Sequence, residues 1–140
     1  ATVVADLQCA PRLVSDRYDC LLLPHVLQLL EEPAAALAEC VRVLRPGGVL
    51  LATVPAVGRI ELGSPRTDHW RFSAAGFAEL VGAAFGAANA AVAGHGGTDA
   101  AIAFLAGLAA EELEPERIEA EAGEPPLVIS ARATKPEGAA

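Results

Sequence analysis

Methionine is absent from this sequence of 140 residues, and lysine occurs only once, at Lys135. Basic residues number 10 against 18 acidic ones, which gives a formal net charge of −8. Such a chain cannot neutralise a phosphate backbone or bind an anionic membrane through a polybasic patch, so we expect neither a nucleic-acid nor a membrane partner. Because the sequence begins at Ala1 inside an apolar run and contains no methionine, we expect it to be a piece of a longer protein.

Cysteines are few and widely spaced, at Cys9, Cys20 and Cys40, and they form no C-x-x-C pair. A zinc site needs four ligands at short paired spacings, which these cysteines and three scattered histidines do not supply. We therefore expect no metal site, and reduced thiols in a cytoplasmic protein. No apolar run reaches the roughly 18 residues that cross a membrane.

Apolar residues, in contrast, are abundant: 53% of the sequence is hydrophobic and the mean hydropathy is +0.38, values typical of a globular domain. Strands are predicted over residues 1–7, 18–23, 49–54, 89–93 and 125–135. A helix is predicted from Pro33 to a Pro46-Gly47-Gly48 stop, and a second over 74–85 with Ser73 as its N-cap. A third is predicted from Thr98 or Asp99 to about residue 112, and residues 111–124 are expected to form an acidic, partly helical surface. This alternation predicts an α/β sheet whose ligand site lies beyond the carboxyl ends of its parallel strands. Residues 6–8, 24–26 and 55 onward are expected at that rim.

Three segments carry a recognisable pattern: Y-D-C-L-L-L-P-H-V-L-Q-L-L from residue 18, V-R-V-L-R-P-G-G-V-L-L-A-T-V-P over 41–55, and D-H-W-R-F-S over 68–73. The pattern resembles the second half of a class I S-adenosylmethionine-dependent methyltransferase of the type 11 kind. The resemblance implies an incomplete Rossmann-like sheet containing family strands 3, 4, 5, 7 and 6, flanked by helices. Residues 1–135 would form this partial domain, and residues 136–140 a disordered tail.

The resemblance also implies S-adenosylmethionine as the cofactor of the intact protein. Asp6 would contact the adenine amino group with Leu7 beside the ring, whereas Leu23 and Pro24 would pass the methionine portion. A turn at the end of a strand is the alternative role for Asp6. The glycine-rich turn and the acidic strand end that chiefly hold the cofactor in this family are missing from the sequence, so we expect this chain alone to be inactive. Residues 1–7 would either fray or pair directly with residues 18–23.

Two histidines are the candidate catalytic residues. His25 follows an apolar strand, where an imidazole could take a proton from a hydroxyl or amine acceptor; a hydrogen-bonded residue at a helix start is the alternative. His69 stands between Asp68, which could orient an imidazole, and Trp70. The alternative for this segment is an aromatic anchor that holds the loop to the core.

Trp70, Arg66 and Arg71 are the candidate residues of the substrate pocket. An aromatic ring can form the wall of such a pocket, and the forked donors of arginine suit an anionic acceptor; ion pairs with local carboxylates are the alternative. The leading hypothesis is the C-terminal portion of a methyltransferase that acts on a small-molecule O or N acceptor. The competing hypothesis is a non-catalytic methyltransferase-like module that associates through the exposed sheet edge at residues 18–23.

Overall fold

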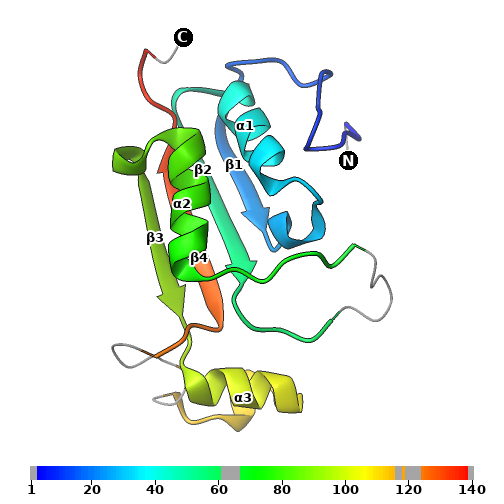
Figure 1. The fold of residues 1–140 in the computed structure, drawn as a ribbon, viewed down its shortest axis with the longest axis vertical. Coiled ribbons are helices and arrows are strands. Elements are labelled where there is room, and N and C mark those ends of the chain that lie inside the picture. Colours follow the sequence, from blue (N-terminus) through cyan, green and yellow to red (C-terminus); the bar gives the residue numbers. More distant parts are fainter. Residues whose placement is uncertain (1–2, 61–66, 116–117, 119–123, 139–140) are drawn as a thin grey trace.

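The computed structural model describes residues 3–60, 67–115, 118 and 124–138. Its centre is a four-stranded sheet in the order β1-β2-β4-β3 (Figure 1). The strands are β1 (Tyr18–Pro24), β2 (Leu44–Pro55), β3 (Ala90–His95) and β4 (Val128–Thr134). β1 runs parallel to β2, and β4 is antiparallel to both β2 and β3. The α/β fold predicted from the sequence is confirmed.

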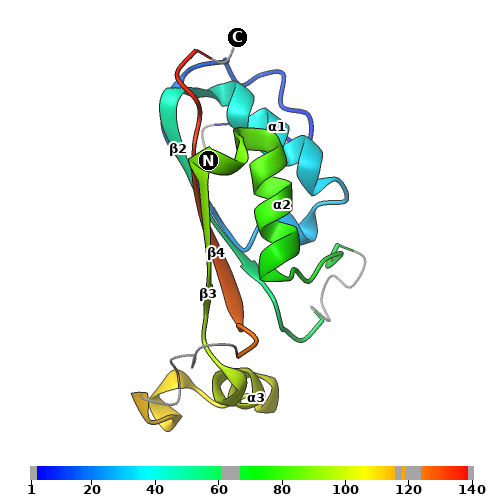
Figure 2. The ribbon, with the colours of Figure 1, turned by 60° about the vertical axis from the view of Figure 1, so that its left-hand side comes forward.

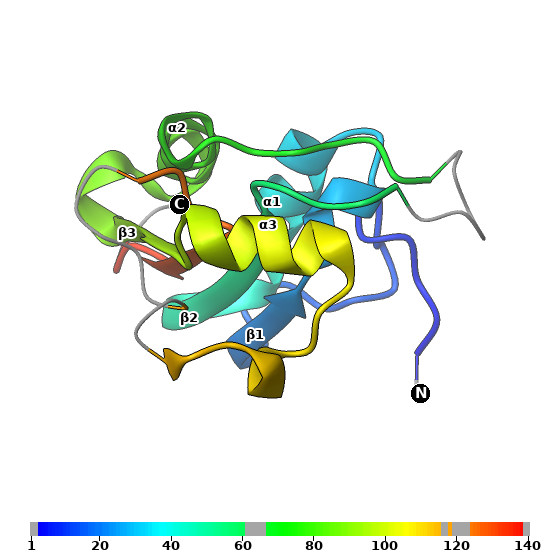
Figure 3. The ribbon, with the colours of Figure 1, turned by 90° about the horizontal axis from the view of Figure 1, so that it is seen from below.

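Helices α1 (Pro33–Val43) and α2 (Ala74–Phe85) pack side by side on the same face of the sheet (Figure 2). Helix α3 (Thr98–Ala106) lies beyond the ends of the strands (Figure 1), and in the view from below it crosses in front of the sheet (Figure 3). There are also three short 3-10 helices in the described residues: η1 (Leu27–Leu29), η2 (Ala87–Asn89) and η3 (Ala110–Glu112). No described helix covers the opposite face of the sheet.

The core lies between the sheet and the two helices. Leu50 and Val54 of β2 are fully buried there, whereas Leu51 between them is 41% exposed, because successive strand residues point to opposite faces. Helix α2 contributes Phe77 and Phe85, both of which are buried. The uncovered face is apolar as well, and its residues line a shallow groove of about 520 Å³.

The predicted helix from Pro33 ends earlier than its stop signal. Val43 is its last residue, and Leu44 already belongs to β2, where it pairs with Tyr18. The register then shifts, so that residues 45–48 form an irregularity in β2 before regular pairing resumes. Gly47 has a left-handed φ of +73°, which favours glycine. The proline-glycine segment is therefore a bend within the strand, and pairing with β1 decides where the strand begins.

The predicted strand over residues 1–7 is not formed. Residues 3–5 have no regular structure, and Asp6 makes only an isolated bridge with Cys9; Ala1 and Thr2 lie outside the described residues. A strand needs a neighbour for its backbone hydrogen bonds, and no described strand lies beside this segment. Of the two expected outcomes for residues 1–7, pairing with residues 18–23 is not seen in the described residues 3–7, which form no strand.

Other boundaries moved by a few residues. Helix α2 has its predicted limits, and Ser73 Oγ accepts the hydrogen bond of Gly76 N at 3.0 Å, which confirms the N-cap. Helix α3 ends at Ala106 instead of near residue 112, because Gly107 adopts a left-handed φ of +83°. Half of the predicted acidic surface over 111–124 lies outside the described residues, as do positions 139–140 of the predicted tail.

Candidate acceptor site at the sheet rim

A cavity of about 490 Å³ opens beyond the carboxyl ends of β1 and β2, on the rim that the sequence predicted. We call it the rim cavity. Its walls come from the end of β1, from η1, from both limbs of the loop between β2 and α2, and from α3. The polar, charged and aromatic residues that line it include His25, Gln28, Arg59, Asp68, Arg71 and Phe104.

His25 enters the rim cavity from a strained backbone position. Its φ of +51° is left-handed, a conformation that costs free energy for a residue with a side chain. Two hydrogen bonds hold it there, because His25 N donates to Thr53 O at 2.9 Å and to Thr53 Oγ1 at 3.3 Å. The end of β2 thus fixes the backbone of the residue that follows β1.

Gln28 connects the parts of the chain that carry both candidate histidines. Its Nε2 donates to His25 O at 2.7 Å, and its own carbonyl oxygen accepts from His69 N at 2.9 Å and from Trp70 N at 3.2 Å. The residue is 8% exposed, and its Oε1 is buried with no hydrogen-bond partner. Sequence reasoning missed Gln28; the available signal was a single amide within the apolar run L-P-H-V-L-Q-L-L.

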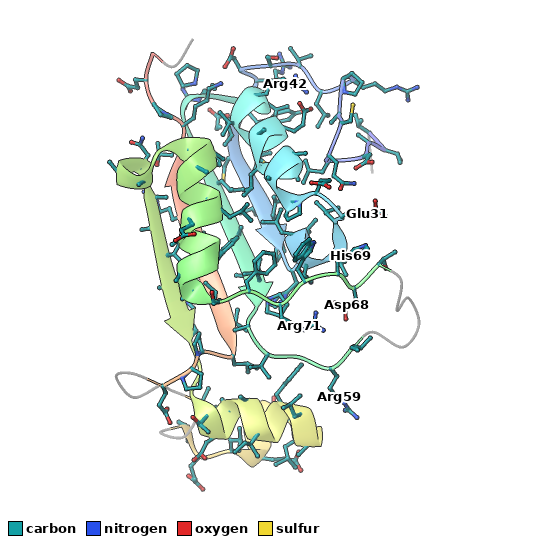
Figure 4. All side chains as sticks on the ribbon, viewed as in Figure 1. Glu31, Arg42, Arg59, Asp68, His69 and Arg71 are labelled. Atoms are coloured by element: carbon teal, nitrogen blue, oxygen red, sulfur yellow. The ribbon has the colours of Figure 1, made fainter. Side chains whose placement is uncertain are left out.

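Arg71 joins the two limbs of the loop. Its Nη1 and Nη2 pair with Asp68 Oδ1 at 2.5 Å and Oδ2 at 2.8 Å, and Nη2 also donates to Arg59 O at 3.0 Å. The Asp68 side chain is only 4% exposed, and its hydrogen bonds raise the pKa of Arg71 above the ordinary value. Figure 4 shows Asp68 and Arg71 on one limb and Arg59 on the other. This pair holds a charged fork at the edge of the cavity.

His69 and Trp70 are not among the described residues that line the rim cavity with His25 and Arg71. His69 is exposed, and Trp70 is 43% exposed with its indole Nε1 donating to Leu30 O at 2.8 Å. Trp70 lines a separate hollow beside the start of α1. Arg66 lies outside the described residues. The contacts of Trp70 are those of an aromatic anchor, the alternative that the sequence left open.

The four residues named for the cofactor make different kinds of contact. Asp6 Oδ1 accepts from Gln8 N at 2.9 Å, which is the contact of a local turn, and Leu7 packs against the core. Leu23 also packs against the core, whereas Pro24 lines the groove on the uncovered face. Of these four residues, Pro24 alone lines the groove, the rim cavity or the hollow beside α1, so the contacts described give S-adenosylmethionine no shared binding surface among the four.

The buried thiol and the acidic side chains add no further site of their own in the described part of the chain. Burial raises the pKa of the Cys40 thiol to about 12, so it is not a nucleophile near neutral pH. No cluster of three or more histidine, cysteine or acidic side chains in the described ranges could hold a metal ion. None of the described helices is long and apolar enough to span a membrane.

Residues 1–52 match the family model described as a methyltransferase domain. The solved structures that resemble this one include the cyclase SpnF, with a TM-score of 0.60 and 21% identity over 97% of this chain and 57% of that chain. The chain has the fold of a methyltransferase domain.

Two further methyltransferases support this assignment. A SAM-dependent methyltransferase from Thermotoga maritima aligns with a TM-score of 0.61 and 19% identity, over 94% of this chain and 62% of that one. Phosphoethanolamine N-methyltransferase 2 from Haemonchus contortus was solved with phosphomonomethylethanolamine and S-adenosylhomocysteine. It aligns with a TM-score of 0.55 and 14% identity, over 88% of this chain and 35% of that one. The chain thus spans less than two thirds of each of these proteins. No curated protein matches it significantly in sequence.

Proposed function

We propose that this methyltransferase-fold chain is the acceptor-binding part of a SAM-dependent methyltransferase that acts on a small-molecule O or N acceptor. The observation that carries the proposal is the rim cavity itself, which lies where ligands bind in open α/β sheets and is lined by the exposed His25. Its volume of about 490 Å³ suits a small molecule. The free thiols of Cys9, Cys20 and Cys40 are in keeping with a reducing, cytoplasmic setting.

The chain's own part in the reaction would be to bind the acceptor, orient it and remove a proton. His25 is the proposed base, because its backbone is held at the cavity by Thr53 and Gln28. Arg71, whose guanidinium is paired with Asp68 through both Nη atoms, would keep the two limbs of the loop in place beside the bound acceptor. Methyl transfer is an in-line displacement, so a large part of the rate comes from such alignment.

Calorimetric titration with S-adenosylhomocysteine tests whether this chain binds the acceptor alone or the cofactor as well. We expect no binding to this chain, because Asp6, Leu7, Leu23 and Pro24 form no common pocket. Micromolar affinity would overturn that expectation.

The role of His25 as the base is tested by making His25→Ala in the intact enzyme, with His69→Ala as the matched control. A loss of roughly 100-fold in kcat for His25→Ala alone is expected, and unchanged turnover would remove His25 from this role.

The second candidate is a non-catalytic module that binds through the β1 edge. Among the described strands β1 pairs only with β2, so the other side of Tyr18–Pro24 has no strand beside it. The similarity to a cyclase also shows that this fold does not by itself imply methyl transfer. Light scattering should detect concentration-dependent association that Leu22→Lys abolishes; a monomer at every concentration would exclude self-association through this edge.

A further inference from the structure

Arg59 brings a guanidinium to the rim cavity that no described residue neutralises. The residue lines the cavity and is exposed. Within the described ranges its side chain forms no ion pair and donates no hydrogen bond. Arg71 of the same wall is, in contrast, paired with Asp68 through both Nη atoms. An uncompensated positive charge therefore remains accessible at the cavity, in a chain whose formal net charge is −8.

The backbone of Arg59 is held in place although its side chain is unpaired. Its carbonyl oxygen accepts a hydrogen bond from Arg71 Nη2 at 3.0 Å. Arg71 is held in turn by Asp68, whose side chain is only 4% exposed. The Asp68–Arg71 pair thus positions Arg59 at the edge of the cavity and leaves its five N–H donors unused.

The guanidinium of Arg59 lies beside the end of helix α3. A Cβ added to Gly107, the C-cap of this helix, would lie 3.6 Å from Arg59 Nη1, which is an ordinary contact distance. Figure 4 shows the side chain reaching toward α3 and away from Arg71. The C-terminal end of a helix favours a nearby cation, so this location stabilises the charged side chain without pairing it.

Apolar surface lines the same cavity. Phe104 of α3 and Leu29 of η1 are part of its wall, and they are 47% and 41% exposed. Side chains of this size gain stability when an apolar group packs on them and displaces water. The wall therefore offers an apolar surface together with one unpaired cation.

We propose that the rim cavity binds an amphipathic organic acid, whose carboxylate pairs with Arg59 and whose apolar body packs on Phe104 and Leu29. The planar fork of a guanidinium suits the two oxygen atoms of a carboxylate. One guanidinium balances one negative charge, so a carboxylate fits an acidic chain better than a phosphate dianion does. This inference rests on the proposed function, because it names the class of acceptor. Arg59 is the residue that selects the acceptor by its charge.

Four probes separate the charge from the apolar body. Benzoate carries both, benzamide has nearly the same shape without the charge, acetate has the charge without the ring, and phenyl phosphate adds a second charge. Binding to the ¹⁵N-labelled chain is followed by NMR at the backbone amides of Gly58 and Leu127, which line the cavity. We expect benzoate to bind about fivefold more tightly than benzamide and about tenfold more tightly than acetate. The preference over benzamide should shrink when the salt concentration is raised from about 20 to about 300 mM.

The variants assign the preference to its residue. Arg59→Met removes the charge, and because the remaining net charge repels anions, benzamide should then bind at least as tightly as benzoate. Arg132→Met is the matched control, since it removes an exposed arginine from the uncovered face, and it should keep the preference. Phe104→Ala should weaken benzoate and benzamide alike, by about threefold, and keep their ratio. The indole N–H of Trp70 shows whether each variant is folded.

The proposal would be overturned by equal affinity for benzoate and benzamide, or by no binding of benzoate at millimolar concentration. A preference that survives Arg59→Met, or that is lost in Arg132→Met, would also overturn it, as would phenyl phosphate binding more tightly than benzoate. The measurement does not depend on methyl transfer. If the preference is found and the intact enzyme transfers no methyl group, the recognition stands and the proposed function fails.

Discussion

Arg42→Met should release the segment that precedes β1 from helix α1. The Arg42 guanidinium donates to Ala10 O at 2.8 Å, to Leu13 O at 2.8 Å and to Ser15 Oγ at 2.9 Å. It also pairs with Glu39, whose Oε2 lies 2.7 Å away and accepts from Ala10 N at 3.1 Å. One side chain thus holds three points of a segment that has almost no regular structure of its own.

The expected loss follows from these contacts. A hydrogen bond contributes about 1 kcal/mol net, and a partly exposed ion pair about 0.5 kcal/mol. The side chains of Arg42 and Glu39 are 32% and 21% exposed, so water replaces part of what is lost. Methionine retains the aliphatic packing of the arginine stem. We therefore expect a loss of about 3 kcal/mol and a Tm lower by about 10 °C.

The stability lost in Arg42→Met should depend on pH. The hydrogen bond from Arg42 lowers the pKa of Glu39, so the unfolded state binds the proton more readily than the folded state. The contribution of the pair is present above the ordinary carboxyl pKa and is lost as the pH falls through the lowered one. The difference between the parent chain and Arg42→Met should be full at pH 7 and shrink below about pH 4.

Urea denaturation followed by circular dichroism, at neutral and at acidic pH, measures both effects. Arg45→Met is the matched control, because Arg45 pairs with Asp19 on the surface, where the two side chains are 58% and 78% exposed. That change should cost less than about 0.5 kcal/mol. An Arg42→Met variant as stable as the control, or a difference that does not change between the two pH values, would refute the reasoning.

Three further predictions test the fold. Ser73→Ala removes the N-cap of α2 and should cost about 1 kcal/mol in urea denaturation, whereas a cost below 0.3 kcal/mol would discount the cap. Gly48→Ala should destabilise by more than about 2 kcal/mol, because its Cβ would lie 2.8 and 3.0 Å from two backbone carbonyl oxygens; an unaffected Tm would contradict this packing. A thiol reagent at pH 8 should modify the exposed Cys9 and Cys20 within minutes, and buried Cys40, whose pKa is raised to about 12, only after unfolding.

Elements with strong local signals could be predicted from the sequence. Helix α2 has a capping Ser73, and Phe77, Val81 and Phe85 recur on one side, so its limits follow from neighbouring residues alone. The start of β2 could not be predicted in this way. Its proline-glycine segment has the composition of a helix stop, but pairing of Leu44 with Tyr18 extends the strand through it.

Some residues of the candidate site could likewise be predicted from the sequence, and others could not. His25 could be chosen because it follows an apolar strand, and a strand end lies at the rim of any parallel sheet. Gln28 could not, because its role depends on backbone atoms of His25 and His69, the latter 41 positions along the chain from Gln28. Asp6 was placed by analogy with the family, and because the described residues 3–7 form no strand, it makes a local turn instead.

Local sequence patterns are sufficient to locate the capped helix, most of the apolar runs that become strands, and the polar residues at the strand ends. The fold is needed to show which polar atoms meet at the rim cavity, that the apolar run at residues 3–7 forms no strand, and which face of the sheet no described helix covers. Helix caps and apolar periods act between residues a few positions apart. Hydrogen bonding and burial, in contrast, depend on distances between atoms that the folded chain brings together from far along its length.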